Sequence, residues 1–510
     1  MIADAATSLD AASTHGYLLV LAIVVPVGGV LIATAVGGRT AERTAFAVIA
    51  AGLILGFAIL LDVWMTSRPL AYVLGNWAAP LGITLRADGI SAVMLVTTAL
   101  IIAATALYAC ADFTIPRDGL EARAPFVFWV LLLAVWAALN TVFLSGDLFN
   151  LYVALELLTF AAVPLVALSG RAEAITAALR YLLFALAGSI FYLLGVALLY
   201  GAYGTLDIIL LHQRIRPELA VSLAVAMMTA GLLAKTALFP LHFWLPPAHA
   251  GAPPAASAIL SALVVKGSFF LIIRIWFDVL PGSRSLAAAQ VLGVMGAAAI
   301  LFGSIVAFRQ ARLKLLIAYS TVAQIGYLFL LFPLVVGFEG SPWSATAWTG
   351  GWIQLVSHAF AKAAMFMAAG LIAQALGHDR IDDLGGVARA LPLTVLAFAI
   401  SGISLMGVPP SGGFVAKWLM LSASVEEGQW WWAVTVVAGG LIAGAYVIRV
   451  MTRMLGPRLE LPTLSVKVDR WRQSLPLSLA ICAMLLGLLP LQSLELLQVG
   501  LPHFLGSAGR

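Results

Sequence analysis

Apolar runs of about twenty residues recur along almost the whole chain, and they constrain the fold more than any other feature. A helix of about 20 residues crosses the hydrocarbon core of a bilayer, so each run predicts a membrane-spanning helix. Only 10% of the residues are charged, far below the roughly 25% that is usual in soluble domains. We therefore expect an integral membrane protein rather than two or three soluble domains.

We predict about fourteen spans, all of them helical. They lie near residues 17–36, 44–65, 87–110, 124–144, 147–168, 177–203, 218–248, 255–280, 286–307, 313–334, 348–376, 392–423, 429–452 and 475–497. Prolines interrupt two of them, in "FPLHFWLPPAHAGAPP" (239–254) and in "GVPPSGG" (407–413). Helices seven and twelve are therefore expected to be discontinuous.

Loop charges predict the orientation. The N-terminal stretch has Asp4 and Asp10 and no basic region, so it does not resemble a cleavable signal peptide and is expected outside. The inner loops then hold most of the basic residues, as the positive-inside rule requires: Arg39, Arg43, Arg117, Arg123, Arg171, Arg309, Arg312, Lys314, Arg380, Arg389 and the loop 453–474. Both termini are expected on the outer side of a bacterial cytoplasmic membrane.

The remaining composition excludes several classes of protein. The net charge of +5 belongs to these loops, and no basic stripe interleaved with aromatic residues predicts nucleic-acid binding. Cys110 and Cys482 lie in or beside apolar runs, and neither a CxxC motif nor a histidine-rich cluster is present. We expect no disulfide framework, no metal site and no redox cofactor, while a quinone pocket stays open.

Six ionisable residues lie within predicted spans: Glu156, Lys235, Lys266, His358, Lys362 and Lys417. A charged group at the centre of a spanning helix costs ~2.5–3.5 kcal/mol, so the lysines and the glutamate together cost on the order of 10 kcal/mol. This cost is comparable with the stability of a whole domain. We therefore expect function, rather than packing, to require these residues.

Their chemistry suits a proton relay. Desolvation favours the neutral forms of lysine and glutamate, so both can exchange protons near neutral pH. An opposite charge at ~4 Å is worth about 4 kcal/mol at an effective dielectric constant of ~20, so each proton changes the affinity of the next site. Breaks in the helices free backbone groups that need protein or water, which predicts a hydrated path. Possible accessory groups are Asp147, His242, His249, Ser320 and Gln324, with Ser257 and Thr321 beside the path.

Structural roles are open alternatives for several of these residues. Lys266 or Lys362 could extend its long stem to a membrane interface. Glu156 could belong to a structural ion pair, His358 could be a satisfied interior histidine, and Asp147 could only stabilise a helix N-terminus. Three arginines nearer to span ends are interpreted as interface anchors: Arg180, Arg274 and Arg449.

Several motifs resemble the proton-translocating membrane subunits shared by respiratory complex I and Mrp-type antiporters. They are "DLFNLYVALELLTF" (147–160), "KTALFPLHFWLPPAHAGAPPAASA" (235–258), "RLKLLIAYSTVAQIGYL" (312–328), "SHAFAKAAMFMAAG" (357–370) and "GVPPSGGFVAKW" (407–418). Within that family, "LGNWAAPLGITLRADGISAVML" (74–95) is most similar to the D subunit of the Mrp-type multisubunit Na⁺/H⁺ antiporter.

This resemblance implies an all-α integral membrane protein with about 14 transmembrane helices, two inverted five-helix repeats (helices 4–8 and 9–13) and discontinuous helices 7 and 12. It divides the chain into helices 1–3 (1–123), the two repeats (124–280 and 281–455), and a basic loop with helix 14 (456–510). It also implies a pair between Glu156 and Lys235, a central relay at Lys266, a continuation through His358 and Lys362, and a terminal carrier at Lys417.

The expected function is a proton-translocating membrane subunit of a multisubunit monovalent cation (Na⁺/K⁺)/proton antiporter, a transporter subunit rather than an enzyme. Its partners would be other membrane subunits, protons, Na⁺ or K⁺ and the lipid bilayer, with no cofactor. The nearest alternative is a proton-pumping antiporter-like subunit of a complex I-like NADH/quinone oxidoreductase or a membrane-bound hydrogenase. Two others are energy coupling for the uptake of another solute, such as inorganic carbon, and a scaffold subunit with a vestigial path.

Overall fold

The computed structural model of the chain describes residues 13–114, 123–280, 285–338, 340–456 and 464–500. In this part, thirteen helices are long and apolar enough to cross a membrane. Helices dominate because a backbone in lipid must satisfy its own hydrogen bonds. Nine spans are single helices: α2 (Tyr17–Val36), α3 (Gly38–Thr66), α4 (Gly89–Ala109), α5 (Arg123–Leu144), α6 (Leu148–Ala167), α7 (Ala172–Tyr203), α13 (Leu286–Arg309), α16 (Pro342–Leu376) and α20 (Trp430–Leu455).

Three further spans are built from consecutive pieces. The first consists of α11 (Pro254–Ile259), the π-helical turn η2 (Leu260–Val264), α12 (Val265–Ile273) and a second π-helical turn η3 (Arg274–Val279). The others are α14 (Leu313–Phe329) with α15 (Leu331–Val335), and α21 (Arg470–Leu485) with η5 (Leu486–Leu488). The sequence predicted plain helices here, and the two π turns are a difference that no residue pattern indicated.

Both predicted discontinuous helices are present. The seventh divides into α9 (Leu219–Thr236) and α10 (Leu245–Gly251), and the twelfth into α18 (Pro392–Met406) and α19 (Gly412–Glu426). Each first half ends in the left-handed conformation, at Ala237 (φ 59°) and at Gly407 (φ 82°). Helix α9 adds to the nine single and three composite spans, which makes thirteen helices of membrane length in the described residues. The two fifteen-residue pieces α18 and α19 together form the twelfth predicted span, which brings the total to fourteen.

The short connecting elements include a departure from the expected all-helical fold. Strands β1 (Leu70–Val73) and β2 (Thr84–Ala87) form an antiparallel hairpin that pairs Leu70 with Ala87. The span predicted at 475–497 is wrong at its end, because α21 and η5 stop at Leu488 and a separate 3-10 helix, η6 (Leu491–Gln498), follows. The other connectors are η1 (Leu74–Asn76), α8 (Ile208–Arg214), η4 (Ile381–Asp383) and α17 (Val387–Ala390).

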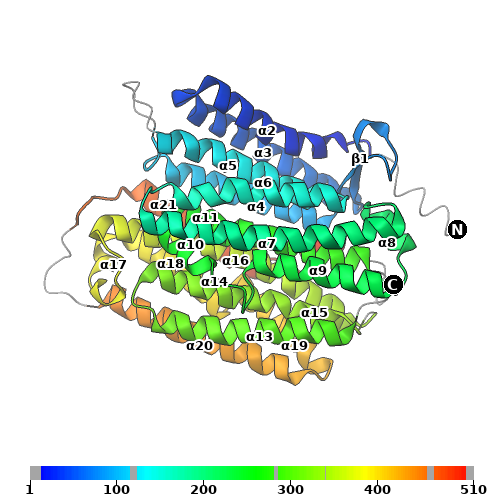
Figure 1. Cartoon of the computed structure of the whole chain (residues 1–510). Coiled ribbons are helices and arrows are strands. Elements are labelled where there is room, and N and C mark those ends of the chain that lie inside the picture. The colour runs from blue at the N-terminus through cyan, green and yellow to red at the C-terminus, as the bar shows by residue number, and fades with distance from the viewer. Residues whose placement is uncertain (1–12, 115–122, 281–284, 339, 457–463, 501–510) are drawn as a thin grey trace.

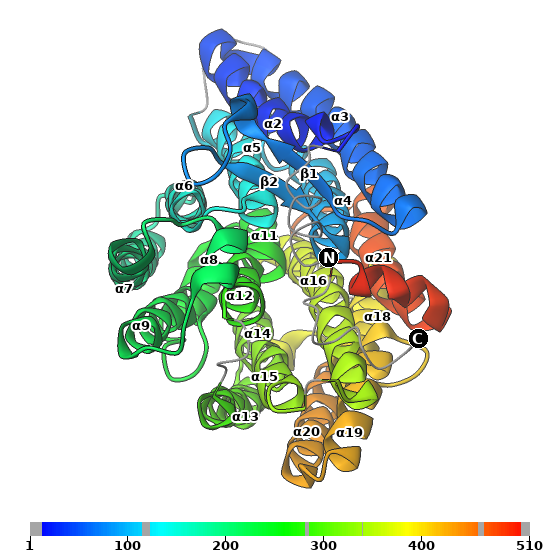
Figure 2. The ribbon, with the colours of Figure 1, turned by 90° about the vertical axis from the view of Figure 1, so that its right-hand side faces the viewer.

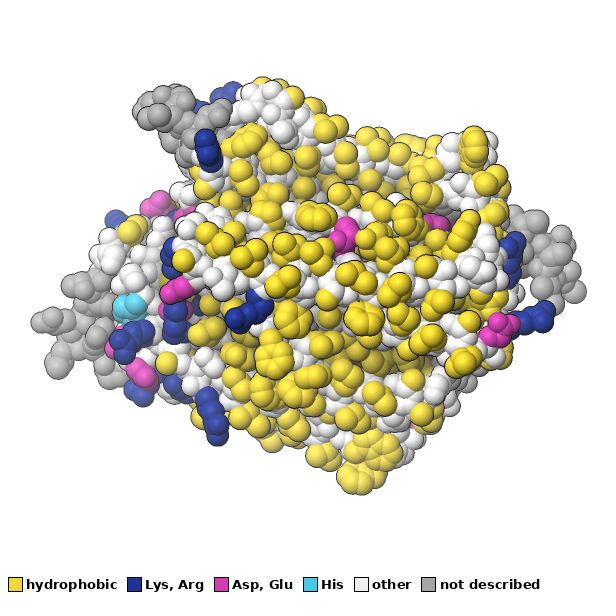
Figure 3. All heavy atoms as spheres, in the orientation of Figure 1, with side chains coloured by type: hydrophobic (Ala, Val, Ile, Leu, Met, Phe, Trp, Pro, Cys, Tyr) yellow, Lys and Arg dark blue, Asp and Glu magenta, His cyan; other side chains and the backbone are white. Residues whose placement is uncertain are grey.

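The helices lie side by side across the molecule (Figure 1). Helices α2 and α3 form one end and α19 and α20 the other, and α21 returns to pack on α4, α16 and α18 (Figure 2). Apolar side chains cover the face shown in Figure 3, and charged side chains gather toward its two edges. This surface is that of a multi-pass membrane protein. Both termini and Arg117 lie outside the described residues, and the domain boundaries stay predictions.

Glycine pairs allow two sets of neighbouring helices to approach closely. A Cβ added to Gly296 of α13 would lie 2.6 Å from the carbonyl oxygen of Gly326 in α14, and the reverse contact is closer still. Gly188 of α7 and Gly231 of α9 make the same reciprocal contact, at 2.5 Å for a Cβ added to Gly188. Small residues at such crossings let helix backbones pack directly in a membrane.

Gly326→Val is expected to lower the free energy of unfolding by about 1–3 kcal/mol, because the new side chain must push α13 and α14 apart. Gly28→Val in α2 is the matched control, since a Cβ there meets nothing within 4 Å. Thermal unfolding of the purified protein in detergent measures both. Equal midpoints for the two variants would contradict the close packing.

Candidate functional site

All six predicted ionisable residues lie on helices in the middle of the chain, and five are buried. Lys235 and Lys417 are each 6% exposed, Lys266 and Lys362 are fully buried, and His358 is 1% exposed. The side chain of Glu156 is 14% exposed. The alternative in which Lys266 or Lys362 extends to a membrane interface is therefore wrong.

Glu156 of α6 and Lys235 of α9 form an ion pair with an Oε1–Nζ distance of 2.8 Å. The Lys235 ammonium also donates to the hydroxyl of Thr159 at 3.1 Å. The hydroxyl of Ser189 in α7 donates to the same Glu156 oxygen. Three helices thus meet at one carboxylate, and no residue pattern indicated either hydroxyl partner.

The break after α9 places Lys235 in the last turn of its helix. The chain turns at Ala237, and the indole of Trp244 returns to donate to the carbonyl of Ala234 at 2.9 Å. Carbonyls in the last turn of a helix have no partner within the helix, so this bond satisfies one of them. Lys235 therefore lies at a helix end where a protein side chain, rather than water, bonds to a free carbonyl.

A cavity of about 10 Å³ adjoins Lys235. It is lined by Leu155, Leu158, Thr159, Tyr181, Ala185, Lys235, Val264 and Ser268. This volume is close to the minimum that accommodates one water molecule. Val264 and Ser268 lie two residues to either side of Lys266 in sequence, so the cavity lies between the first lysine and the helix that carries the second.

Lys266 follows the π turn η2, and its ammonium donates to the carbonyl of Ser261 in that turn. The Ser261 hydroxyl is 2.9 Å from the hydroxyl of Thr321 in α14. A π turn rotates the residues that follow it relative to a regular helix. The turn thereby contributes a carbonyl and a hydroxyl that connect Lys266 to the second half of the chain.

Lys362 of α16 contacts α14 directly. Its ammonium donates to the carbonyl of Ile317 at 3.0 Å and to the hydroxyl of Ser320. Ser320 and Thr321 are adjacent in α14, so one helix contacts the partners of both central lysines. The predicted accessory residue Ser320 is thus in direct contact with Lys362.

Lys417 lies in α19, beyond the second break. Its ammonium donates to the carbonyl of Leu405 at 2.5 Å and lies 4.5 Å from the centre of the Tyr327 ring. The Leu405 carbonyl, in the last turn of α18, also accepts from the side chain of Gln324 at 3.2 Å. Gln324 is one helical turn after Ser320, so the predicted accessory pair connects Lys362 to Lys417.

Two buried histidines lie among these lysines with unpaired ring nitrogens. His249 interacts electrostatically with Lys314, Lys362 and Lys266. His358 interacts with Lys266, Lys362 and Lys417. Within the described residues, neither nitrogen of either ring has a hydrogen-bond partner. A buried polar atom without a protein partner costs about 1–3 kcal/mol, so these rings are unusual among the buried polar groups of the described residues.

Within the described residues, the two remaining accessory residues, Asp147 and His242, form no hydrogen bond with the buried lysines. Asp147 precedes α6 and accepts from the backbone N–H groups of Phe149 and Asn150, so it caps that helix. The ring of His242 lies in the first break, surrounded by Phe239, Phe243 and Phe302. The structure gives Asp147 a local capping role and gives His242 aromatic neighbours rather than lysines.

We compared the chain with known protein families and structures. Residues 145–443, which contain all six ionisable residues, match the family described as NADH:quinone oxidoreductase/Mrp antiporter, TM. The chain belongs to this family. The resemblance inferred from the motifs is confirmed.

Two relatives of this NADH:quinone oxidoreductase/Mrp antiporter family member carry different names. The N subunit of NADH-quinone oxidoreductase from Desulforudis audaxviator is 34% identical over 486 residues, covering 92% of this chain and 94% of that protein. The D subunit of the Na⁺/H⁺ antiporter from Bacillus subtilis is 29% identical over 404 residues, covering 79% of each. A chain in the solved Mrp complex from Dietzia sp. DQ12-45-1b superposes with a TM-score of 0.85 at 26% identity, covering 97% of this chain and 98% of that one.

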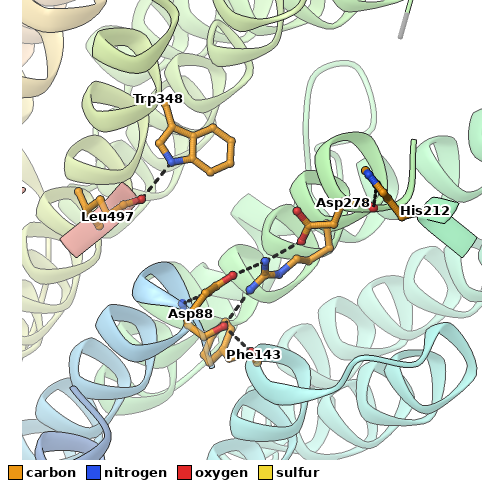
Figure 4. A network of polar contacts seen from close by, with 8 residues as sticks. Asp88, Phe143, His212, Asp278, Trp348 and Leu497 are labelled. Atoms are coloured by element: carbon orange, nitrogen blue, oxygen red, sulfur yellow. Dashed lines mark hydrogen bonds and ion pairs between the residues drawn. The ribbon is translucent and has the colours of Figure 1, made fainter. Parts of the chain in front are cut away.

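The structure of this family member also contains a buried ion cluster that the sequence interpretation missed (Figure 4). Arg274 donates at 2.6 Å to both Asp88 and Asp278, and at 2.9 Å to the hydroxyl of Ser91. Its prediction as an interface anchor is wrong, because the residue is only 9% exposed. The i,i+4 spacing of Arg274 and Asp278 was a usable signal, whereas Asp88 lies 186 positions away.

Asp88 joins the cluster to several elements. Burial alone would raise the pKa of this carboxyl, but the Arg274 guanidinium beside it holds the pKa below its ordinary value. Asp88 also caps α4 through the N–H of Ser91 at 2.9 Å. The next residue, Gly89, donates to the carbonyl of Val499 at 3.0 Å, so the segment after η6 covers this end of the molecule.

Asp88→Asn is expected to destabilise the fold by up to about 3 kcal/mol, because it leaves the buried Arg274 with one carboxylate instead of two. Asp382→Asn is the control, since its pair with Arg453 is exposed on both sides and such pairs contribute little. Thermal unfolding in detergent compares the two. An Asp88 variant as stable as the control would show that Asp278 alone suffices.

Proposed function

We propose that this chain is the proton-translocating subunit of a multisubunit monovalent cation (Na⁺ or K⁺)/proton antiporter in a bacterial cytoplasmic membrane. The observation that carries the proposal is the row of buried ammonium groups at Lys235, Lys266, Lys362 and Lys417. Each donates to a carboxylate or a backbone carbonyl. Helix α14 supplies the acceptors of Lys362 and bonds to the residues that accept from Lys266 and Lys417. A structural scaffold would not require four buried cations on four helices.

A proton entering the row would act through electrostatic coupling. A charged Lys235 is stabilised by Glu156, and such a pair is worth about 4 kcal/mol at ~4 Å and an effective dielectric constant of ~20. Transfer through the small cavity toward Lys266 would weaken that pair and bring positive charge toward Lys362. The unpaired ring nitrogens of His249 and His358 can accept or relay a proton between these lysines.

Further steps would carry the charge to Lys417 through Ser320 and Gln324 of α14. Moving one charge through a potential of ~100 mV supplies about 2.3 kcal/mol, which can drive cation exchange. Other membrane subunits would complete the assembly, as the names of the relatives and the solved Mrp complex suggest. The chain would be oriented with both termini outside, following the loop charges.

Lys266→Ala and Lys417→Ala are each expected to abolish cation-dependent proton movement in inverted vesicles, since either removes a carrier from the row. Lys467→Ala, in the exposed segment before α21, is the matched control and should leave exchange unchanged. Fluorescence quenching of a pH-sensitive dye on adding Na⁺ or K⁺ measures the activity. Immunodetection of the assembled complex checks that each variant is present. Normal exchange in both the Lys266→Ala and the Lys417→Ala variants would contradict the proposed proton relay.

A second candidate is the proton-pumping subunit of a complex I-like assembly, favoured by the 34% identity to an NADH-quinone oxidoreductase subunit over 92% of the chain. The two differ in what drives the protons. If the antiporter proposal holds, Na⁺ or K⁺ will dissipate a preformed proton gradient in vesicles that contain the complex, and adding NADH with a quinone will establish none beyond that of vesicles lacking this chain. Proton pumping that depends on NADH, on quinone and on Lys266 would support the oxidoreductase assembly instead.

A further inference from the structure

A basic cavity of about 420 Å³ opens where α7 begins, away from the lysine row. It is lined by Arg171, Ala172, Glu173, Thr176, Ala177, Arg180, Pro247, Ala250, Gly251 and Arg312. Three arginines from two distant parts of the sequence therefore face one space. The proposed relay uses none of them.

These guanidinium groups have few carboxylates to neutralise them. Arg312 is 2.9 Å from Asp379, and Glu173 is the one acidic residue in the lining. Arg171 donates to the carbonyl of Gly251 at 3.3 Å, and within the described residues neither Arg171 nor Arg180 forms an ion pair. Three arginines thus outnumber two carboxylates, and the cavity favours an anion.

A partly buried lysine lies near the cavity. The ammonium of Lys314 donates to the carbonyl of Ala252. Its side chain interacts electrostatically with Asp379 as well as with Arg171 and Arg312. Since Asp379 and burial offset this charge, the three arginines of the lining are the groups that favour a ligand with several acceptor oxygens, such as a phosphate, which arginines bind through paired N–H donors.

Helix α7 is long enough to place the cavity at the headgroup layer of a bilayer. Helix α7 has 32 residues and is about 48 Å long at 1.5 Å per residue, against about 30 Å for the hydrocarbon core. If the helix is centred, about six residues project at each end, so Arg171 and Thr176 lie at headgroup level. Arg180 lies about one turn deeper, within reach of the same level through its flexible stem.

An exposed apolar lane leads away from the cavity along α7. At helical spacing after Arg180 come the exposed residues Leu183, Ala187, Ile190 and Leu194. These residues share one face of the helix. From Arg180 to Leu194 the lane runs about 21 Å, long enough for an acyl chain that starts at the headgroup.

We propose that this cavity binds the phosphate headgroup of an anionic phospholipid, with an acyl chain lying along Leu183, Ile190 and Leu194 of α7. The lane would accommodate the acyl chain of a lipid, which a free anion lacks. The lipid would bridge α7, α10 and the start of α14, and so hold together the two halves of the chain on the side where Lys314 lies. This site is separate from the proposed proton path and does not depend on it.

The test uses the full chain in its native assembly, transferred to nanodiscs of phosphatidylcholine into which phosphatidylglycerol is titrated. Native mass spectrometry counts the bound lipid. Arg171→Gln with Arg180→Gln is expected to weaken phosphatidylglycerol binding about 30-fold, the equivalent of about 2 kcal/mol at about 1 kcal/mol per basic side chain. The charge-matched control, Arg214→Gln with Arg216→Gln near the C-terminal end of α8, should bind as the unmodified protein does.

Two further measurements test whether the cavity requires positive charge and whether it prefers a lipid to a free phosphate. Arg171→Lys with Arg180→Lys should restore most of the binding, because the charge returns. Inorganic phosphate should compete weakly, because it lacks an acyl chain. Equal lipid binding in the pocket and control variants would overturn the proposal, as would displacement by phosphate as effective as by lipid. Loss of a neighbouring subunit from the pocket variant, without loss of lipid, would assign the cavity to a protein partner instead.

Discussion

The central physical problem in this molecule is how to keep cations and broken helices inside a membrane. Backbone groups freed by a break have no water to bind in lipid, and a buried ammonium group needs acceptors. The structure meets the two needs together at the second break. There the ammonium of Lys417 donates to the carbonyl of Leu405, in the last turn of α18. A charge that would otherwise be costly thereby satisfies a helix end.

The buried ammonium groups also find acceptors at the π turn before Lys266 and at the first break. At Lys266 the turn presents the carbonyl of Ser261 to the ammonium, while at Lys235 the acceptor is the carboxylate of Glu156 and the helix end is satisfied by Trp244. A neutral lysine can still donate a hydrogen bond, but it no longer carries a charge, so loss of the proton weakens each of these bonds. The protonation state of each lysine in the row is thus coupled to the strength of its local hydrogen bond.

Helix α14 makes the row continuous between the two halves. Within about two turns it supplies the Ile317 carbonyl and the side chains of Ser320, Thr321 and Gln324. The hydroxyl of Tyr446 lies beside Ser320 and Gln324 from α20. The sequence interpretation placed Ser320 and Gln324 near the path from their polarity alone. It did not identify α14 as the helix that contacts Lys362 and Lys417 directly and bonds to Ser261, the partner of Lys266. That role depends on which face of an almost wholly apolar helix turns inward.

The number and positions of the spans, the two breaks and the six ionisable residues could all be predicted from local sequence, because they depend on composition within about twenty residues. Residue type alone also marked His249 and Asp147. Contacts in the folded chain were needed to establish that Asp147 caps a helix, that His249 lies among the lysines, and that Arg274 pairs with Asp88 rather than reaching an interface. Spans that are apolar all round carry no stripe to reveal which face is buried. The rotation of each helix, and with it every contact between distant residues, is therefore set by packing.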